Sequence, residues 1–384
     1  MRIGFFTDYT YPGGHGVETT IDAFQKGLEA AGHEVFIYAP YDKEIKDAKK
    51  NIFRFRSLKL QKNPKMFLSF FLLPVGKTRK EVMDFKLDVA HAHSALTLGM
   101  LAKQIAKKQK IPLVYEQHTD YPTWLKDNLR DKFILPRIVE SWVSRYANQA
   151  DAIIAPSPKI KATLLKWKVK KPIYFLPNCI DFGLFHKDRS GRNELRKKYS
   201  IAPDAKVLIF VGRLSREKNL IFLLEVLAEI VKKNKNVVLM LVGEGYQKEK
   251  LKKTAEELGI AANVRFTGFI PHEKVAQYYN ASDVFVMSSL SEVMPVVVLE
   301  AEATGLPCVI LDDLAFHDTV FEGENGFVVK ENNPSSFAEK TLELLVNKEL
   351  YDKFSARAEE VAKGFGIEEQ TKKLLEIYAT VAKK

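Results

Sequence analysis

Residues 206–219 read KVLIFVGRLSREKN, a short apolar run that ends at a glycine and passes through a polar turn toward the next helix. Such runs, bounded by turns and followed by amphipathic stretches, recur along the chain, which is the pattern of parallel sheets with crossover helices. The clearest helices are expected at residues 19–31, 96–108 and 135–147. Strands are predicted at 3–7, 35–38, 52–54, 89–92, 113–116, 153–155 and 173–175, and again at 206–211, 237–241, 264–266, 284–286, 308–311 and 326–328.

The chain has 384 residues, which is too long for one ordinary domain and suits two. A polar segment at 187–204 separates the two series of strands. We therefore predict an α/β protein of two doubly wound, Rossmann-like domains, residues 1–186 and 187–366, that face each other across a cleft. Ligands of such sheets bind at the carboxyl ends of the strands.

The composition excludes several classes of protein. Hydrophobic residues at 46% and charged residues at 28% are values of a folded globular chain rather than a disordered one. The two cysteines, Cys179 and Cys308, provide neither a disulfide framework nor a zinc motif. The first residues do not resemble a secretory signal, and no apolar run approaches the ~20 residues that cross a bilayer. We therefore expect a cytoplasmic protein.

The formal net charge of +11 is concentrated in two segments of the first half. Residues 51–80 contain eight Lys or Arg and residues 152–180 contain six Lys, and neither segment contains an acid. Such charge attracts nucleic acid, anionic lipid or phosphorylated substrates. Because no nucleic-acid recognition module is present, we do not expect nucleic acid as a partner.

Two glycine-containing turns are candidate phosphate sites. The stretch PGGHGVE at 12–18 has glycines that would let backbone N–H groups approach a phosphate, although a plain tight turn explains it as well. Its spacing is neither that of a dinucleotide-binding loop nor that of a P-loop. In the second turn, Arg213 and Lys218 follow the strand end and Gly212, where they could neutralise a diphosphate or simply be solvated.

The third motif is SEVMPVVVLEA at 291–301, in which a helix is predicted to begin about Pro295. Glu292 precedes this helix and Glu300 lies on its second turn. An ionised carboxylate only accepts hydrogen bonds, so each could bind the hydroxyls of a sugar or ribose. The alternatives are a glutamate that complements the helix dipole and a solvated glutamate.

Taken in order, the stretches GRLSREKN, LVGEGYQKEKL, VRFTGFIPHEKVAQYYNASDVFVMSS and SEVMPVVVLEAEATGLPCV resemble the GT-B retaining nucleotide-sugar glycosyltransferases of glycosyltransferase family four. The resemblance covers nearly the whole chain. It implies that residues 367–384 form a helix that crosses back onto the first domain. Val293 departs from relatives, which often have Gly there, and this leaves the donor sugar open.

The resemblance also implies roles for single residues. Arg213 and Lys218 would bind the donor diphosphate, Glu292 the donor sugar and Glu300 the ribose. His118 would lie near the reacting carbon, as a base or as a hydrogen-bond donor that orients the sugar. The remaining donor-binding positions are Gly14, Gly16, Gly212, Gly268, Ile270, Met294, Pro295 and Val296.

The implied reaction is transfer with retention of configuration, in which the departing phosphate oxygen takes the proton of the acceptor. No cofactor other than the nucleotide sugar is expected. No metal ion is expected either, because Asp312 and Asp313 are adjacent and no Asp-x-Asp motif occurs.

The stretch MFLSFFLLPVG at 66–76 lies between basic residues, as expected for a segment in a membrane interface. A buried helix with basic ends is the alternative, and the segment Lys159–Lys171 with Trp167 would add to the same face. Family members that glycosylate diacylglycerol or phosphatidylinositol have a similar region. The predicted membrane-facing residues are Arg54, Arg56, Lys59, Lys62, Lys65, Phe67, Phe70, Phe71, Lys77, Arg79 and Lys80.

The sequence thus predicts a hexosyltransferase that moves glucose from UDP-glucose to a membrane lipid such as diacylglycerol, while attached peripherally to the inner face of the cell membrane. A GT-B enzyme acting on a soluble glycan or polyol is the main alternative. A UDP-sugar epimerase, a phosphorylase and a non-enzymatic nucleotide-binding protein also remain open.

Overall fold

A computed structural model describes residues 1–12, 16–43, 45, 51–61, 66–121, 134–289, 291–330 and 332–382. The chain forms two compact units. The first contains Met1–Cys179 together with Ile367–Lys384, and the second contains Ile180–Gly366. The chain thus enters the second unit at Ile180, seven residues before the boundary expected from the polar segment.

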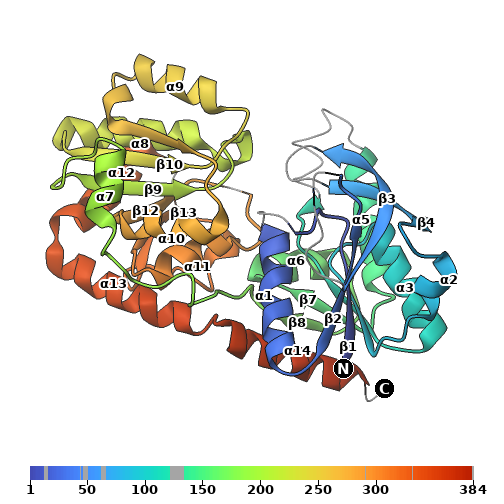
Figure 1. The fold of residues 1–384 in the computed structure, drawn as a ribbon. Coiled ribbons are helices and arrows are strands. Elements are labelled where there is room, and N and C mark those ends of the chain that lie inside the picture. The colour runs from blue at the N-terminus through green and yellow to red at the C-terminus, as the bar shows by residue number, and fades with distance from the viewer. Residues whose placement is uncertain are drawn as a thin grey trace. The chain divides into compact units, whose positions relative to one another are not determined.

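The first unit is built on an eight-stranded sheet with the order β4-β3-β2-β1-β5-β6-β7-β8 (Figure 1). All neighbouring strands are parallel except β3 and β4, which are antiparallel. The strand order reverses between β1 and β5, and ligands of doubly wound sheets bind at such a point. The strands are β1 (Arg2–Phe6), β2 (Glu34–Pro40), β3 (Ile52–Gln61), β4 (Met66–Pro74), β5 (Val89–Ala92), β6 (Leu113–Glu116), β7 (Ala152–Ala155) and β8 (Ile173–Phe175).

Local sequence explains why the helices of this unit begin and end where they do. Helix α6 has Pro158 in its first turn, and the hydroxyl of Ser157 accepts a hydrogen bond from the Ile160 backbone N–H. Gly32, just after α1, has a positive φ of 80° that most residues avoid. The helices are α1 (Gly16–Ala30), α2 (Arg79–Asp84), α3 (Thr97–Gln109), α5 (Ile134–Ala147), α6 (Pro158–Lys166) and α14 (Ile367–Ala382).

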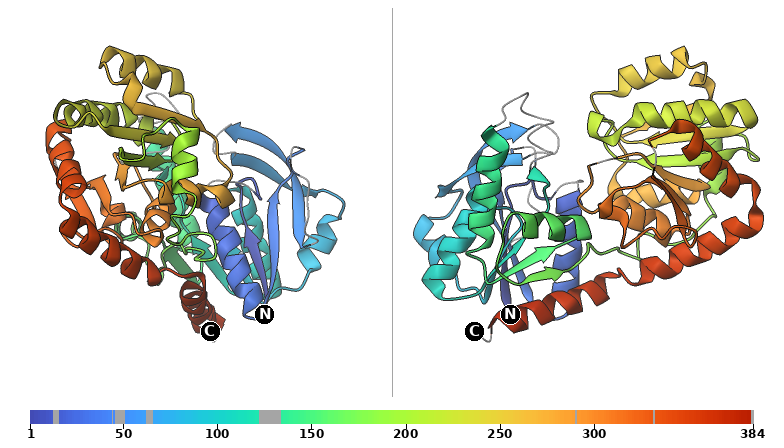
Figure 2. Two further views of the ribbon diagram at one scale, coloured as in Figure 1. Left: turned by 60° about the vertical axis from the view of Figure 1, so that its left-hand side comes forward. Right: turned by 180° about the vertical axis from the view of Figure 1, so that it is seen from behind.

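Helix α14 belongs to the first unit although it lies at the other end of the chain, and it packs beside α1 (Figures 1 and 2). A Cβ atom on Gly27 of α1 would lie 2.0 Å from the Thr371 hydroxyl of α14, so this close approach requires glycine. Leu374 and Tyr378 are fully buried in the core that the two helices share with β1 and β2. A helix from residue 367 that packs on the first domain is what the resemblance implied.

The second unit has six parallel strands in the order β11-β10-β9-β12-β13-β14, which is the Rossmann arrangement with its reversal between β9 and β12. Its strands are almost wholly apolar because helices cover both faces (Figure 2). The strands are β9 (Lys206–Val211), β10 (Val237–Val242), β11 (Val264–Gly268), β12 (Val284–Met287), β13 (Cys308–Leu311) and β14 (Gly326–Val329). The helices are α7 (Arg192–Lys198), α8 (Leu220–Lys233), α9 (Lys248–Glu257), α10 (His272–Asn280), α11 (Val296–Ala303), α12 (Pro334–Val346) and α13 (Lys348–Lys363), with short 3-10 turns η1 (Arg216–Lys218), η2 (Ala261–Asn263) and η3 (Leu314–Phe316).

The basic, aromatic region of the first unit is a β-hairpin rather than a helix. Strands β3 and β4 pair along the edge of the sheet, so the alternative of a buried helix is wrong. The short strand predicted at 52–54 continues to Gln61 because β4 supplies an antiparallel partner.

Two of the membrane-facing predictions are also wrong. Arg54 is buried, with 6% of its surface exposed, and its guanidinium donates to the carbonyl oxygens of Pro40 at 2.9 Å and of Tyr11 at 2.5 Å. Trp167 is buried where it ends α6, and its carbonyl accepts a hydrogen bond from Ser144. Both side chains are buried inside the first unit, so they cannot face a lipid surface. Among the described helices, none is both long and apolar enough to cross a membrane.

Candidate active site

The turn after β9 is held close to its neighbours by glycines. The Gly212 N–H donates to the Val242 carbonyl at 2.9 Å, and the Gly243 N–H donates to the Gly268 carbonyl at 3.0 Å. A Cβ on Gly243 would lie 1.9 Å from the Gly212 carbonyl oxygen, and φ at Gly243 is 138°. Only glycine allows the two turns to pass each other at this distance. The turns that follow β9 and β10 are therefore closely packed at the carboxyl edge of the sheet.

Lys218 is positioned by the chain that follows β12. The Ser288 hydroxyl donates to the Lys218 carbonyl at 2.8 Å and to the Asn219 carbonyl at 3.0 Å, and the Ser289 hydroxyl donates to the Glu217 carbonyl at 3.2 Å. Asn219 adopts the left-handed conformation that turns η1 into α8. The loops on either side of the strand-order reversal are therefore fastened to each other.

The structure brings two predicted residues into direct contact. Lys218 Nζ lies 2.5 Å from Glu292 Oε1, and both side chains are mostly buried. Arg213 lies in the same turn, with its guanidinium 4.0 Å from the Glu217 carboxylate. Such charge-assisted contacts fix the directions of both long side chains. A cation able to bind phosphate and a carboxylate able to bind hydroxyls are thus adjacent.

Glu300 is buried on α11, so it is not a solvated glutamate. Its Oε1 lies 2.7 Å from His272 Nε2, and its Oε2 accepts a hydrogen bond from the Tyr279 hydroxyl at 2.8 Å. His272 and Tyr279 both lie on α10. Burial, followed by the neighbouring Glu300, raises the pKa of the Tyr279 hydroxyl well above its ordinary value, so Tyr279 remains a donor. The sequence analysis missed His272, although it lies two residues after the predicted donor-binding position Ile270.

The other donor-binding predictions lie around these groups. Pro295 is extended and precedes α11, which begins at Val296 rather than at the proline itself, and Met294, Pro295 and Val296 are buried. Gly268 ends β11 with a φ of 77°, and Ile270 packs against the core. Gly16 is the first residue of α1 in the first unit. Gly14 lies outside the described residues.

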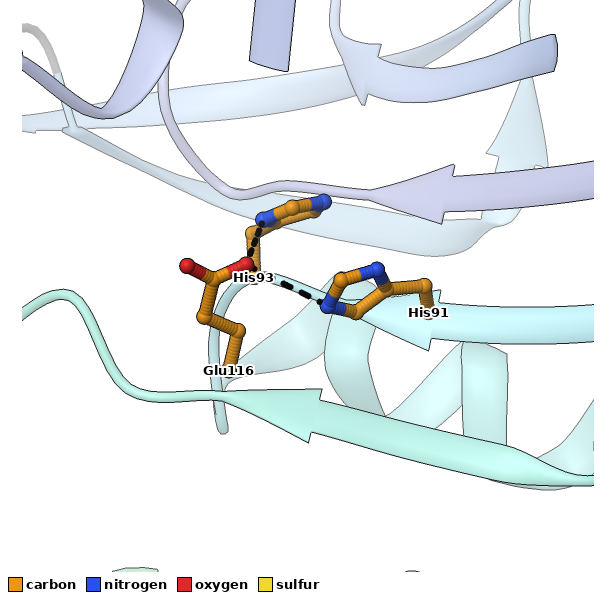
Figure 3. A group of neighbouring side chains, drawn as sticks. All are labelled: His91, His93 and Glu116. Carbon is orange, nitrogen blue, oxygen red and sulfur yellow. Dashed lines mark ion pairs between the residues drawn. The ribbon is translucent and has the colours of Figure 1, made fainter. Parts of the chain in front are cut away.

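In the first unit, the carboxyl ends of β5 and β6 bring four ionisable side chains together. Three nitrogen atoms surround the Glu116 carboxylate: His91 Nε2 at 3.4 Å, His93 Nδ1 at 3.5 Å and His118 Nε2 at 3.5 Å. Figure 3 shows the carboxylate facing both His91 and His93. We call His91, His93, Glu116 and His118 the histidine–glutamate cluster. Of these four residues, the sequence analysis identified only His118. The sequence HAH at 91–93, at the end of a predicted strand, could have indicated two more.

All four side chains of the cluster are nearly inaccessible to solvent. Burial lowers the pKa of His91 and lowers that of His93 further, so both imidazoles are neutral near pH 7. Burial alone would raise the pKa of Glu116, but the three histidines outweigh it and hold this pKa well below its ordinary value. The cluster therefore contains a carboxylate anion in a dry environment.

The cluster also has the residue types of a metal site. His91, His93 and Glu116 could each offer one ligand atom, and these atoms lie within 4.8 Å of one another. However, His93 Nδ1, the nitrogen that faces Glu116, also lies 3.0 Å from His118 Nε2, at hydrogen-bond distance. A metal ion would have to break this contact. The contacts therefore fit a hydrogen-bonded network better than a metal centre.

Asp8 fastens the turn after β1 to the beginning of α3. Its carboxylate accepts hydrogen bonds from the hydroxyls of Ser94, at 2.6 Å, and Thr97, and from the Leu98 N–H at 3.1 Å. Burial raises the pKa of Asp8 to about 6, although these hydrogen bonds lower it. The adjacent Tyr9 hydroxyl lies 2.5 Å from the Thr119 hydroxyl, next to His118. These contacts hold the loop that contains His118 against β1.

Two doubly wound units, one with a lysine–glutamate pair and a buried glutamate at its strand ends, are the arrangement expected of a protein that binds a nucleotide or an activated derivative of one. Comparison with known proteins specifies the family. The family described as glycosyl transferases group 1 matches residues 191–361, and glycosyltransferase family 4 matches residues 14–183.

Individual relatives agree. An alpha-monoglucosyldiacylglycerol synthase of Streptococcus pneumoniae is 31% identical over 80% of this chain and 70% of the relative. The enzyme of the same name from Acholeplasma laidlawii is 28% identical over 98% of this chain and 96% of its own length. The chain belongs to glycosyltransferase family four and is a glycosyltransferase, as the sequence predicted.

The fold class is confirmed by solved structures. HepE of Anabaena, in complex with UDP, superimposes with a TM-score of 0.81 at 19% identity and covers 99% of this chain and 100% of its own. The predicted GT-B fold class, with two Rossmann-like units, is therefore correct.

Proposed function

We propose that this glycosyltransferase moves glucose from UDP-glucose to the free hydroxyl of diacylglycerol, with retention of configuration and without a required metal ion. The two relatives named above are alpha-monoglucosyldiacylglycerol synthases. Structures of HepE contain UDP and UDP-glucose, which supports a uridine nucleotide as the donor. The acceptor assignment rests chiefly on the relatives.

The Lys218–Glu292 pair is the observation that carries the donor assignment. Lys218 is a point charge suited to phosphate, and Glu292 is an acceptor suited to sugar hydroxyls. They meet at the strand-order reversal of a Rossmann sheet, where such sheets bind nucleotides. Glu300, with His272 and Tyr279 holding its carboxylate, is proposed to bind the ribose.

In this mechanism the chain binds and orients rather than forms a bond to the sugar. The acceptor hydroxyl attacks the sugar carbon on the face from which the nucleotide diphosphate departs, and a phosphate oxygen of the leaving group takes its proton. Arg213 and Lys218 stabilise the negative charge that grows on the diphosphate. Glu292 and His118 orient the sugar through hydrogen bonds.

The exposed side chains of the β3–β4 hairpin support a lipid acceptor. Leu58 on β3 is 59% exposed, and on β4 Phe70 is 42% and Leu73 51% exposed. An exposed apolar edge strand favours aggregation unless something covers it. The remaining predicted cations with described side chains, Arg56, Lys77, Arg79 and Lys80, are exposed beside it. Apolar side chains flanked by cations suit an anionic bilayer surface, so we propose peripheral attachment at the inner face of the cell membrane.

The remaining predicted membrane-facing residues provide less support for this proposal. Lys59 lies opposite Phe67 in the register of β3 and β4, and Phe71 also belongs to β4. Lys62 and Lys65 lie outside the described residues.

The experiment that tests this function offers labelled UDP-glucose, UDP-galactose and UDP-N-acetylglucosamine to the purified protein. The acceptors are diacylglycerol in anionic vesicles, extracted lipids, and soluble glycans and polyols, and the products are separated by thin-layer chromatography. We expect glucosyl-diacylglycerol with an α linkage. Transfer to a soluble acceptor alone would refute the lipid assignment, and the absence of any transfer would refute the proposed activity.

A further inference from the structure

The Glu116 carboxylate is a buried anion that the proposed reaction does not use. Among the residues that the structure describes, three imidazole nitrogens lie 3.4 to 3.5 Å from its oxygens, which is long for a hydrogen bond. Burying an anion is costly unless neighbouring groups compensate its charge. The three histidines that face Glu116 supply this compensation, so the carboxylate and the imidazoles are coupled.

The contacts around the cluster indicate where its protons lie. The Tyr378 hydroxyl, on α14, lies 2.7 Å from His91 Nδ1. When Tyr378 donates this hydrogen bond, the neutral His91 ring carries its proton on Nε2, the nitrogen that faces Glu116. Phe5, on β1, packs edge-on against His91 and His93 and carries no charge. Within the part of the chain that the structure describes, the ionisable groups that face the carboxylate are thus the three histidines, with Tyr378 behind His91.

The same reasoning applies to His118. Its Nε2 faces both Glu116 Oε1 and His93 Nδ1, and a proton on this nitrogen can be donated to either of them. Its ring also lies nearly parallel to the His93 ring, with the centroids 5.2 Å apart. Two neighbours therefore fix the rotation of the His118 ring, and among the described residues no hydrogen bond or ion pair occupies its Nδ1.

We infer that Glu116 is a positioning residue that acts through His118, holding the proton on His118 Nε2 and directing Nδ1 toward the substrate. The arrangement follows the general logic by which a buried carboxylate orients a functional histidine. This inference rests on the proposed function, because only there does His118 contact the donor sugar.

The test replaces Glu116 by Gln, which keeps the shape and removes the charge. We expect kcat for glucose transfer to fall about 10- to 100-fold, while KM for UDP-glucose changes less than about twofold. The limb of the kcat pH profile that depends on the cluster should move toward lower pH, because the carboxylate that raises the pKa of the His91 and His93 imidazoles against the effect of their burial is gone. Glu116→Asp should recover part of the lost rate.

A double-mutant cycle separates positioning from general damage. If Glu116 acts through His118, then Glu116→Gln in a His118→Gln background should cost much less than it does alone. The matched control is Glu302→Gln, the same change at another buried glutamate, outside the cluster, which should leave the pH profile unchanged. Additive losses, or an unmoved pH profile for Glu116→Gln, would overturn the inference.

Two further measurements test the inference if Glu116→Gln does not fold or if the protein does not transfer glucose. Long-range 1H–15N spectra of the wild-type imidazoles, assigned with His118→Gln, should show His118 protonated on Nε2, and protonation on Nδ1 alone would overturn the inference. A divalent metal bound stoichiometrically to the wild-type protein, but not to Glu116→Gln, would also overturn it. A wild-type protein that transfers no glucose would refute the proposed function, whereas the spectra would still report on Glu116 and His118.

Discussion

At the scale of residues, the second unit brings groups of opposite charge together at the ends of neighbouring strands. Lys218 and Glu292 come from loops that are 74 residues apart, and the hydroxyls of Ser288 and Ser289 hold the two loops together. The sequence could indicate each group by its position after a strand or before a helix. It could not indicate their pairing, because this depends on which strands are neighbours in the sheet.

Lys218→Ala should weaken binding of UDP-glucose about tenfold or more, because a charge-assisted contact to phosphate contributes about 1.5–3 kcal/mol. Isothermal titration calorimetry with UDP and UDP-glucose measures the change. Lys232→Ala is the matched control, since Lys232 is exposed in the same unit and pairs only with the nearby Glu229 among the described residues. Equal affinity of Lys218→Ala and wild type would contradict the donor assignment.

Asp318 provides a prediction of stability against pH. Burial raises the pKa of this carboxyl to about 7. Burial, followed by the charge of Asp318, also raises the pKa of the neighbouring Glu302. Between about pH 4 and pH 7 the folded state binds a proton that the unfolded state releases, so the contribution of Asp318 to stability falls as the pH rises through this range.

Asp318→Asn replaces the buried carboxyl, which becomes charged in the folded protein above about pH 7, by a side chain that does not ionise. At pH 8 the variant should therefore be more stable than wild type by about 1–2 kcal/mol, and near pH 4 the difference should vanish. Thermal unfolding of both proteins across this range provides the measurement. The exposed Asp352→Asn should give a difference from wild type that does not vary between pH 5 and pH 8. A constant difference for Asp318→Asn would show that Asp318 does not titrate in this range.

At the scale of elements, periodicity predicted the strands and helices well where the strands are parallel and buried. The helix expected at 135–147 is α5, and the strand expected at 173–175 is β8. The sequence did not predict strand β4. A continuous apolar run such as MFLSFFLL has neither the alternation of a strand nor the period of a helix, and it is a strand here because it pairs with β3. The sequence also could not predict the burial of Arg54, because this side chain binds carbonyl groups of β2 and of the turn after β1 that are distant in sequence.

The same hairpin should bind anionic membranes. Replacing Arg56, Lys77 and Lys80 together by Ser removes three positive charges, each of which contributes about 1 kcal/mol near a charged bilayer. Sedimentation with vesicles that contain phosphatidylglycerol should then leave most of the protein in solution. Replacing Lys232, Lys252 and Lys253, which are exposed on helices of the second unit, removes the same charge elsewhere and should leave binding intact. Equal loss in both variants would indicate attraction without a specific face.

At the scale of the whole molecule, the chain enters the first unit twice. Met1–Cys179 forms the sheet, and α14 returns after the complete second unit to cover α1. Length and composition predicted two domains, and the resemblance implied the returning helix. Neither could place Tyr378 beside His91, because that contact joins residues 287 positions apart.

Leu374→Ala tests the docking of α14. Leu374 is fully buried in the core of the first unit, and removing most of such a side chain costs about 2–5 kcal/mol. We expect thermal unfolding of the first unit at lower temperature and faster proteolysis within Met1–Cys179. Val346→Ala, at an exposed position on α12, is the control and should unfold like the wild type. Destabilisation confined to the second unit would contradict the assignment of α14 to the first.

The return of α14 sets an order for synthesis on the ribosome. Phe24 and Leu28 of α1 are fully buried beside this helix, so the segment that covers them is translated only after the whole second unit. The second unit is contiguous in sequence and can mature as soon as residue 366 has left the exit tunnel. The N-terminal half, although made first, must wait with an apolar stripe uncovered. We therefore expect nascent chains stopped before α14 to recruit chaperones through their N-terminal half.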